Sequence, residues 1–415
     1  MDKNNGAIYD ARKLGKPKMI ILGIQHMFAM FGATILVPIL TGLDISTTLL
    51  MAGLGTLLFH CITKFKVPAF LGSSFAFLGG YAAIKAFSPN DPNSMLPYAC
   101  LGVACAGLIY FILAAVIKAV GIEKVMRFFP PVVTGPIIIA IGLGLAPSAV
   151  SNCTTNWFLA VVALAVIVVF NIWGKGMAKI IPIILGLLIS YGTGLVLYFI
   201  SQANPDLIQN VPWLFSGGAD ANGVYQPIFD FTSLNTICDN ISKGHIFGSE
   251  GLIGIPIHWD KTVFGGIDYS NGALIASSII AIVPIAFATM MEHIGDICAI
   301  SSTTGNNYIK DPGLHRTLVG DGLATTLASL FGGPANTTYG ENTGVLALTR
   351  VYDPRVIRIA AYFAVAVSFF PIVSVIIGSI PSCIIGGISF VLYGMISAIG
   401  VSCLLYTSPS PRDRQ

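Results

Sequence analysis

Four carboxylates lie inside segments that are otherwise apolar, and these side chains are the best suited in the sequence to bind a ligand or move a proton. They are Glu292, Asp296, Asp321 and Glu341. Glu292 and Asp296 are four residues apart, so a helix places both on one face. An ionisable side chain at the centre of a bilayer costs about 2.5–3.5 kcal/mol on insertion scales, so acids at such positions indicate function.

The stretch from Ala335 to Gly344 combines one of these acids with residues that do not favour a continuous helix. Threonine, glycine and asparagine are poor helix formers. Irregular backbone at membrane depth is tolerated only where it is buried in protein or lines a cavity. We therefore predict an extended segment that leads into a half-helix, whose first N–H groups are free to donate to a ligand. Glu341 would lie beside these donors.

A second short segment, Ser73-Ser74-Phe75, has the same character and adds an aromatic ring. Backbone amides, carboxylates and a ring together suit a small planar ligand with alternating N–H and C=O groups, which is the profile of a nucleobase. Simple cations would need several oxygen ligands, and simple anions would favour arginine. The cysteines show no metal-ligand spacing. The sequence thus predicts neither a metal site nor a cofactor.

Membrane-spanning helices are the elements expected to position these residues. The chain has 54% hydrophobic and 10% charged residues, whereas soluble proteins have about 25% charged residues. Apolar runs near the ~20 residues that cross a bilayer recur along it. We expect an all-α polytopic membrane protein of about twelve spans, at 18–41, 46–63, 68–86, 96–121, 130–149, 156–173, 178–200, 271–300, 317–333, 338–352, 355–379 and 382–406.

The basic residues give these spans an orientation. Cytoplasmic loops hold an excess of lysine and arginine. With a cytoplasmic N-terminus, 17 of the 22 basic residues fall on the inner side, against Lys243 and Lys261 on the outer side. The chain is therefore expected to be a multi-pass protein of the inner (plasma) membrane, surrounded by lipid. Since the positive charge follows this rule, the net charge of +3 does not indicate a nucleic-acid partner.

The two halves of the sequence repeat one arrangement. Gln25-His26 in the first half is followed by Ser73-Ser74, and Glu292-His293 in the second half is followed by Thr337-Thr338. The intervals from each histidine to the second hydroxyl residue are similar, at 48 and 45 residues. Seven spans precede the polar region 201–270, and an odd number would make the second half enter the membrane in the opposite direction. This predicts an inverted-repeat transporter, with short extended segments in spans 3 and 10.

Several motifs carry a resemblance to a known family. The segment 341–350, ENTGVLALTR, resembles the signature Q/E-N-x-G-x-x-x-x-T-R/K/G of the nucleobase–ascorbate transporter family. QHMFAMFGAT at 25–34, LGSSFAF at 71–77 and DPGLHR at 311–316 are similar to segments of its bacterial uracil permeases. The resemblance covers about positions 18 to 402 and implies a proton-coupled symporter with two inverted repeats of seven spans each.

The resemblance also implies a core domain and a gate domain, each built from both halves. The boundaries expected here are a cytoplasmic tail at 1–17, core at 18–121, gate at 122–200, outer loop at 201–270, core at 271–379, gate at 380–406 and a foreign tail at 407–415. Spans 13 and 14 of the family pattern would then be absent from this chain, which predicts a transport defect. A homodimer is a further expectation.

Site residues follow from the same resemblance, position by position. It implies that Glu292 and Glu341 hold the base and that the amides of Phe75 and Gly340 donate to its oxygens. From the ring chemistry alone, we expect Phe75 or Tyr339 to stack on the base. Site support or proton coupling is expected from Asp296, His26, Asp321, Asn342 and Ser74.

The resemblance is not complete, which keeps two substrates open. Asp296 stands where similar uracil permeases have histidine, and Asp321 also looks like the purine-permease pattern. Glu341 favours uracil, because purine members usually carry glutamine there. Uracil is the predicted substrate, and xanthine or another purine is the alternative. From other classes, a membrane-embedded enzyme using two acids and a passive channel remain alternatives, although the sequence contains no P-loop, HExxH or GxSxG motif.

Overall fold

The computed structural model describes residues 7–121, 124–125, 131–179 and 181–405. A few side chains within helices lie outside this description, and that of Glu341 is one of them. The structure is mostly helical and divides into two compact units, which are considered separately. Unit 1 comprises Met1–Phe129 and Ile253–Ser374, and unit 2 comprises Pro130–Leu252 and Val375–Gln415. The expected tail at 407–415 lies outside the described residues.

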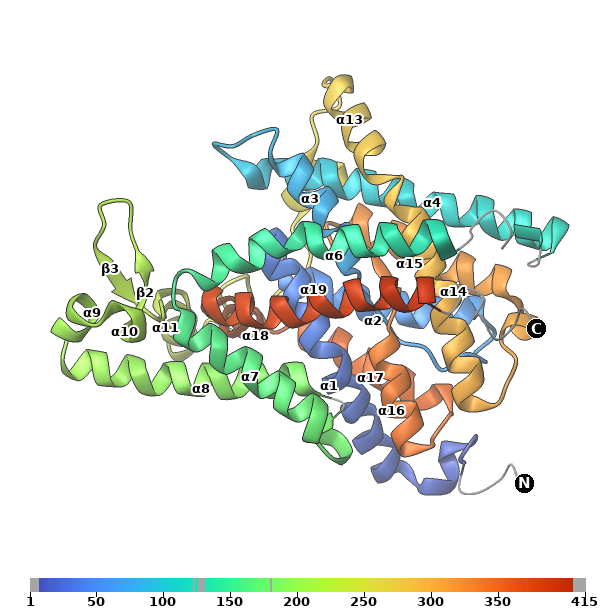
Figure 1. Cartoon of the computed structure of the whole chain (residues 1–415), viewed down its shortest axis with the longest axis horizontal. Coiled ribbons are helices and arrows are strands. Elements are labelled where there is room, and N and C mark those ends of the chain that lie inside the picture. Colours follow the sequence, from blue (N-terminus) through green and yellow to red (C-terminus); the bar gives the residue numbers. More distant parts are fainter. Residues whose placement is uncertain (1–6, 122–123, 126–130, 180, 406–415) are drawn as a thin grey trace. The chain divides into compact units, whose positions relative to one another are not determined.

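Unit 1 is built from two stretches of the chain (Figure 1). The first contains η1 (Ala11–Leu14), α1 (Lys16–Thr41), α2 (Ile45–Ile62), β1 (Leu71–Ser73), η2 (Phe75–Phe77), α3 (Leu78–Lys85), η3 (Pro92–Met95) and α4 (Leu96–Val120). The second contains η5 (Trp259–Lys261), α12 (Val263–Gly266), α13 (Gly272–Ile282), α14 (Ile285–Thr304), the π-helical turn η6 (Ile309–Gly313), α15 (Leu314–Leu330), β4 (Asn336–Thr338), α16 (Gly340–Thr349) and α17 (Pro354–Ser368). The helix α18 (Pro371–Gly378) follows.

Unit 2 consists of long apolar helices and a small polar cluster. Its elements are α6 (Pro131–Cys153), α7 (Trp157–Trp173), η4 (Gly176–Lys179), α8 (Pro182–Ala203), α9 (Asp206–Asn210), α10 (Pro212–Phe215), β2 (Ser216–Ala219), β3 (Tyr225–Pro227), α11 (Thr232–Ser242) and α19 (Ser382–Leu405). Figure 1 shows α19 (red) lying alongside α6, and α19 also packs against α7 and α8. Residues 380–405 thus complete a helical layer begun by 131–203.

Glycines allow the closest helix contacts in both units, as is common in membranes. In unit 1, α4 and α15 meet at Gly107 and Gly322: a β-carbon on Gly107 would lie 2.7 Å from the Gly322 carbonyl oxygen. In unit 2, α6 and α19 approach closely at two separate places: a β-carbon on Gly142 would lie 2.7 Å from the Tyr393 carbonyl oxygen, and one on Gly400 would lie 2.7 Å from the Gly135 carbonyl oxygen. Small residues therefore fix both helix pairs at short range.

Five described helices are long and apolar enough to cross a membrane, and a sixth span results if the bent pair α17–α18 is counted as one. Several expected spans are divided. The span expected at 271–300 corresponds to Gly272–Thr304, which is one of these five and comprises α13 and α14 with an interruption near Pro284, and the span expected at 355–379 is bent by 87° between α17 and α18. Spans 3 and 10 each consist of a strand and a short helix, as predicted. The total of twelve stays a prediction.

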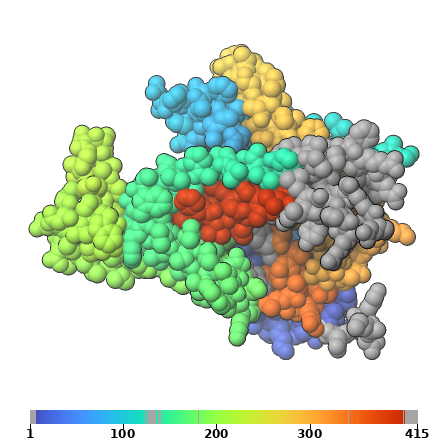
Figure 2. Space-filling model, viewed as in Figure 1, coloured from blue at the N-terminus to red at the C-terminus, as the bar shows by residue number. Residues whose placement is uncertain are grey.

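The polar region expected as an outer loop at 201–270 has more structure than its composition indicated. Within unit 2, β2 and β3 form an antiparallel hairpin, and α9 and α10 pack at the end of α8. The Asn156 side chain caps α7 and donates to the carbonyl oxygen of Ser216 (2.9 Å). Phe229 and Phe231 stack with ring centroids 5.2 Å apart. This cluster forms the yellow-green projection at one end of α7 and α8 in Figure 2.

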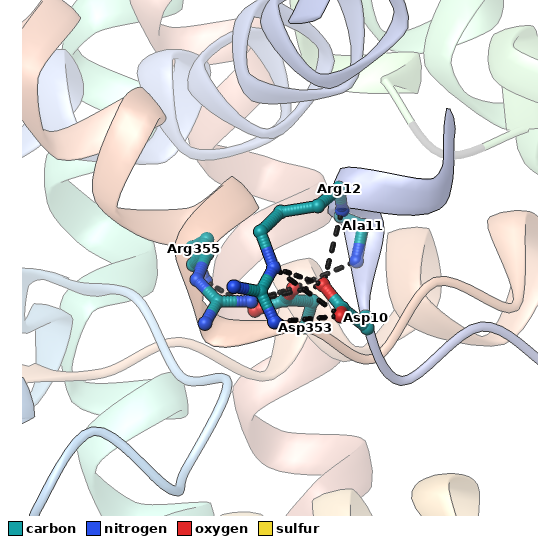
Figure 3. A network of polar contacts seen from close by, with 5 residues as sticks. All are labelled: Asp10, Ala11, Arg12, Asp353 and Arg355. Atoms are coloured by element: carbon teal, nitrogen blue, oxygen red, sulfur yellow. Dashed lines mark hydrogen bonds and ion pairs between the residues drawn. The ribbon is translucent and has the colours of Figure 1, made fainter. Parts of the chain in front are cut away.

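The N-terminal segment of unit 1 is anchored to the turn before α17 (Figure 3). The buried backbone N–H of Ala11 donates to Asp353 Oδ2 (2.7 Å), and Arg355 Nη1 donates to Asp10 Oδ1 (3.0 Å). Hydrogen bonds from the Arg12 side chain lower the pKa of Asp10 from 3.8 to about 2, so this carboxylate is ionised at neutral pH. Ile8 adds a short parallel bridge to Val351. Residues 8–14 are therefore held in place by the chain just beyond α16.

We expect Asp353→Ala to release this N-terminal segment. The variant removes a 3%-exposed acceptor, and leaving a buried donor unpaired costs about 1–3 kcal/mol. Because proteolysis of an opened segment follows the population of the open form, trypsin should cleave after Arg12 at least about fivefold faster in detergent. Asp91→Ala, at an exposed loop position, is the control. An unchanged cleavage rate in Asp353→Ala would contradict the anchoring role.

Candidate functional site

A two-stranded sheet of six residues lies at the centre of unit 1. β1 and β4 come from opposite halves of the sequence and pair antiparallel, with Leu71 opposite Thr338 and Ser73 opposite Asn336. The hydrogen-bond ladder continues at both ends, where Ser74 N donates to the Ala335 carbonyl oxygen and Tyr339 N donates to that of Phe70, each at 2.9 Å. All six strand residues are buried. The two extended segments predicted separately thus form one structure.

Hydrogen bonds with three neighbouring helices tie down the outer edges of this sheet. Thr56 of α2 accepts from Leu71 N (2.9 Å), and Thr325 of α15 donates to the carbonyl oxygen of Asn336 (2.9 Å). Asn336 in turn donates to the Met51 carbonyl oxygen of α2 (2.8 Å). Ser73 Oγ donates to the Thr34 carbonyl oxygen of α1 (3.0 Å). Such partners are necessary because unpaired backbone groups at membrane depth cost several kcal/mol each.

The strand pair fixes the starting points of two short helices. β1 leads into η2 and α3, whereas β4 leads into α16. Because the strands are antiparallel, these helices leave the sheet in opposite directions, and both of their N-termini lie beside it. The first N–H groups of a helix lack partners within the helix and carry the positive end of its dipole. The structure therefore places two sets of donors around one small sheet.

Thr338, the last residue of β4, connects three titratable side chains. Its backbone N–H donates to Asp321 Oδ1 (2.9 Å), and its Oγ1 donates to Asp296 Oδ2 (3.3 Å). The same hydroxyl oxygen lies 3.1 Å from His293 Nδ1, which is also 3.4 Å from Asp321 Oδ1. His293 and Asp321 are fully buried, whereas Asp296 is half-buried. The network thus runs from the interior of unit 1 toward its surface.

The predicted ligand-binding residues lie at the end of this network. Glu292 is exposed and precedes Asp296 by one helical turn on α14. Gly340, the first residue of α16, is also exposed, and a β-carbon added there would lie 3.3 Å from Asp296 Oδ1. Phe75 is half-buried at the start of η2. The backbone of Glu341 continues α16, but its side chain lies outside the described residues.

The remaining predicted site residues are buried. Tyr339 is 5% exposed, and its hydroxyl donates to the carbonyl oxygen of Ser73 (2.8 Å), so it ties β1 to the start of α16. Ser74 contributes its backbone to the ladder. His26 and Asn342 are 0% and 1% exposed. Within the described part of the chain, both ring nitrogens of His26 and both side-chain polar atoms of Asn342 lack a hydrogen-bond partner.

Sequence reasoning missed the supporting residues. From the sequence alone, His293 fits a helix-packing residue as well as a residue with a direct role in the site. In the structure it contacts both Thr338 and Asp321. Tyr110 of α4, which donates to Thr289 Oγ1 (2.7 Å) on α14, is likewise indistinguishable from other apolar-helix tyrosines. The one usable signal is the position of Thr338 in an extended segment between two acid-bearing helices. Among the described residues, no three His, Cys, Asp or Glu side chains gather to hold a metal ion.

Comparisons with known proteins agree with this architecture. A family model described as "Permease family" matches residues 17–407. The uracil permease of Bacillus caldolyticus is 38% identical over 397 residues, which cover 93% of this chain and 79% of the relative. The uracil permease of Bacillus subtilis is 37% identical over 93% of this chain and 80% of its own length. A probable uracil permease of Haemophilus influenzae is 36% identical over 95% of this chain and 83% of its own length.

Solved structures give the fold. The transmembrane domain of the cyanobacterial bicarbonate transporter BicA has a TM-score of 0.61 at 14% identity and is matched over 97% of this chain and 93% of its own length. SLC26A9 has a TM-score of 0.54 at 11% identity, over 96% of this chain and 61% of its own. These transporters share the inverted-repeat fold, which confirms the predicted fold class.

Proposed function

This chain belongs to the permease family, the nucleobase–ascorbate transporters that its motifs predict, and on that basis we propose that it is a secondary active transporter that takes up uracil together with protons. The observation that carries the proposal is the pairing of β1 with β4, which sets two helix N-termini around Gly340 and the acids of α14. The names of the relatives, which are uracil permeases, support the substrate.

The proposed site uses each group according to its chemistry. The carboxylates of Glu292 and Glu341 accept from the two N–H groups of uracil, and the amides of Phe75 and Gly340 donate to its two carbonyl oxygens. Phe75 is the ring proposed to stack on the base, since the 5% exposure of Tyr339 leaves little of that ring to contact a ligand. Asp296, Asp321, His26, Asn342 and Ser74 are proposed to support the site or its proton coupling.

The two units suggest how transport would proceed. Unit 1 carries every proposed binding residue, so we assign it to the core domain, and we assign unit 2 to the gate domain. Alternating access then requires one unit to move against the other. We further propose that the protein resides in the inner membrane with a cytoplasmic N-terminus, where it forms a homodimer and is not an enzyme. The distribution of basic residues supports this orientation.

A binding titration tests the substrate most simply. Purified protein is titrated with uracil and separately with xanthine, and recovery of unchanged ligand is checked by chromatography. Tighter binding of uracil, with uracil recovered intact, is the expected result. Tighter binding of xanthine would support the purine alternative, which Asp296 and Asp321 favour. Conversion of the ligand would show an enzyme.

Glu341→Gln is expected to weaken the binding of uracil relative to that of xanthine. A carboxylate only accepts hydrogen bonds, whereas an amide has both an acceptor and a donor. The amide would hold the uracil N–H without charge assistance, and it would offer its donor to an acceptor nitrogen of a purine. Because buried polar groups reject a mismatched ligand strongly, loss of uracil binding should precede any gain of xanthine binding. Competition binding curves on wild type and variant measure the affinities for uracil and xanthine. An unchanged ratio of these affinities would show that Glu341 does not contact the part of the base that distinguishes the two ligands.

A further inference from the structure

The network around Thr338 has an order that the proposed transport function does not by itself explain. The side chains at its two ends differ in exposure. Asp296 is half-buried and adjoins Gly340, whereas Asp321 is 0% exposed and His293 is 1% exposed. A single hydroxyl links the ends, with Oγ1 at 3.3 Å from Asp296 Oδ2 and 3.1 Å from His293 Nδ1. No proposed ligand contact uses this hydroxyl.

The hydroxyl proton makes the two ends depend on one another. When Asp296 is ionised, Thr338 donates to it, and the hydroxyl oxygen can accept from an N–H at His293 Nδ1. When Asp296 is protonated, the carboxylic acid can donate to the hydroxyl oxygen, which frees the hydroxyl proton to face His293 Nδ1. The direction of the whole chain therefore reverses with the charge of Asp296.

The buried end can hold a proton without leaving a net charge in the interior. His293 Nδ1 lies 3.4 Å from Asp321 Oδ1, so a protonated imidazole would be paired with a carboxylate. Within the described residues, His293 Nε2 and Asp321 Oδ2 are buried without hydrogen-bond partners, so neither atom is committed to another contact. A paired charge of this kind is far cheaper to bury than an isolated one.

Other titratable groups near the pair are few in the described structure. Glu292 lies on α14 itself, and Tyr110 of α4 is within electrostatic range of both Asp321 and Glu292. The ring of Phe59, from α2, covers His293 at a centroid distance of 6.4 Å. α16 contributes Glu341, whose side chain is not among those described.

We propose that the Thr338 hydroxyl is a proton relay between Asp296 and the buried His293–Asp321 pair. This pair stores the coupled proton during transport. In the transfer, the Asp296 O–H bond breaks as its proton moves to Thr338 Oγ1, and the original hydroxyl proton moves from Oγ1 to His293 Nδ1. Asp296 becomes a carboxylate, and His293 becomes an imidazolium beside the Asp321 carboxylate. No oxidant, metal or second reactant takes part. This inference rests on the proposed proton-coupled function.

Thr338→Val tests the relay, because valine keeps the branched shape and removes the hydroxyl. A version of the protein that carries spans 13 and 14 of the family pattern serves as wild type. In sealed liposomes it is assayed for uracil binding, for uracil counterflow at equal pH on both sides, and for accumulation driven by a pH gradient. We expect binding within about twofold of wild type and retained counterflow, but at least a tenfold loss of accumulation. Thr338→Ser, which restores the hydroxyl, should accumulate uracil as wild type does.

A second variant keeps the test decisive if valine destabilises the protein. His293→Asn leaves an amide near the position of Nδ1 but cannot be protonated, so it should show the same loss of accumulation with retained counterflow. Wild-type accumulation in Thr338→Val or His293→Asn would overturn the relay, and so would loss of binding and counterflow in both, which would indicate a structural role. Wild-type protein that neither binds nor accumulates uracil would overturn the proposed function and the relay with it.

Discussion

Glu292→Ala is expected to lower the affinity for uracil at least tenfold. The side chain is exposed on α14, one turn before Asp296, and its loss would leave one N–H of the bound base without an acceptor. Hydrogen bonds to charged groups contribute about 1.5–3 kcal/mol, and a tenfold change in affinity corresponds to about 1.4 kcal/mol. Equilibrium binding of radiolabelled uracil to the purified variant measures the effect.

Glu250→Ala is the matched control for this prediction. It removes the same side chain from an exposed position in unit 2, where Glu250 Oε2 accepts from Asn240 Nδ2 (3.2 Å). Its affinity for uracil should equal that of wild type. Glu292→Ala protein that bound uracil with near-normal affinity would remove Glu292 from the proposed site.

Gly72→Ala should disrupt the strand pair and with it the site. A β-carbon on Gly72 would lie 2.6 Å from Cε2 and Cζ of Tyr339 and 2.8 Å from Thr34 Oγ1. The phenol ring cannot easily move aside, because its hydroxyl donates to the carbonyl oxygen of Ser73 (2.8 Å). Overpacking of this kind costs about 1–3 kcal/mol. We expect a lower midpoint of thermal unfolding and at least about tenfold weaker uracil binding, measured on the same preparation.

Gly79→Ala provides the comparison within the adjacent helix α3. The same methyl group at Gly79 meets no atom within 4 Å, and alanine favours a helix over glycine by about 1 kcal/mol. This variant should match or exceed the stability of wild type and bind uracil normally. Equal behaviour of the Gly72 and Gly79 variants would mean that close packing between β1 and Tyr339 does not support the site.

The local character of the site could be predicted from the sequence. Thr337, Thr338 and Gly340 are poor helix formers in an apolar context, and this alone indicated an extended segment followed by a half-helix, which β4 and α16 confirm. Ser73 and Ser74 gave the corresponding prediction for β1 and α3. These features depend on residues close together in the chain, where backbone preferences and the absence of water act directly.

The partnership between β1 and β4 could not be predicted in this way. Leu71 and Thr338 come from different halves of the chain, and no local preference states which strand pairs with which or in which register. The same applies to Thr56, Thr325 and Asn336, whose polar groups complete the sheet edges. Each is an ordinary polar residue in its own segment, and its role depends on the packing of α2 and α15 around the sheet.

Breaks within the spans were only partly visible in the sequence. Pro284 and Pro371 stand where the expected spans at 271–300 and 355–379 divide, and proline removes a helix N–H. Yet α6 is one helix with Pro136 and Pro147 inside it. A proline is therefore compatible with either outcome, and the surrounding packing decides between them.

Accumulation of uracil in proteoliposomes tests the central claim most directly. A version of the protein that carries spans 13 and 14 of the family pattern is reconstituted, a pH gradient with the acidic side outside is imposed, and labelled uracil is followed inside with and without a protonophore. A proton-coupled transporter concentrates uracil above its external level, loses this accumulation when the protonophore is added, and is inhibited more strongly by unlabelled uracil than by xanthine. Uracil that merely equilibrates across the membrane, indifferent to both the gradient and the protonophore, would contradict the account.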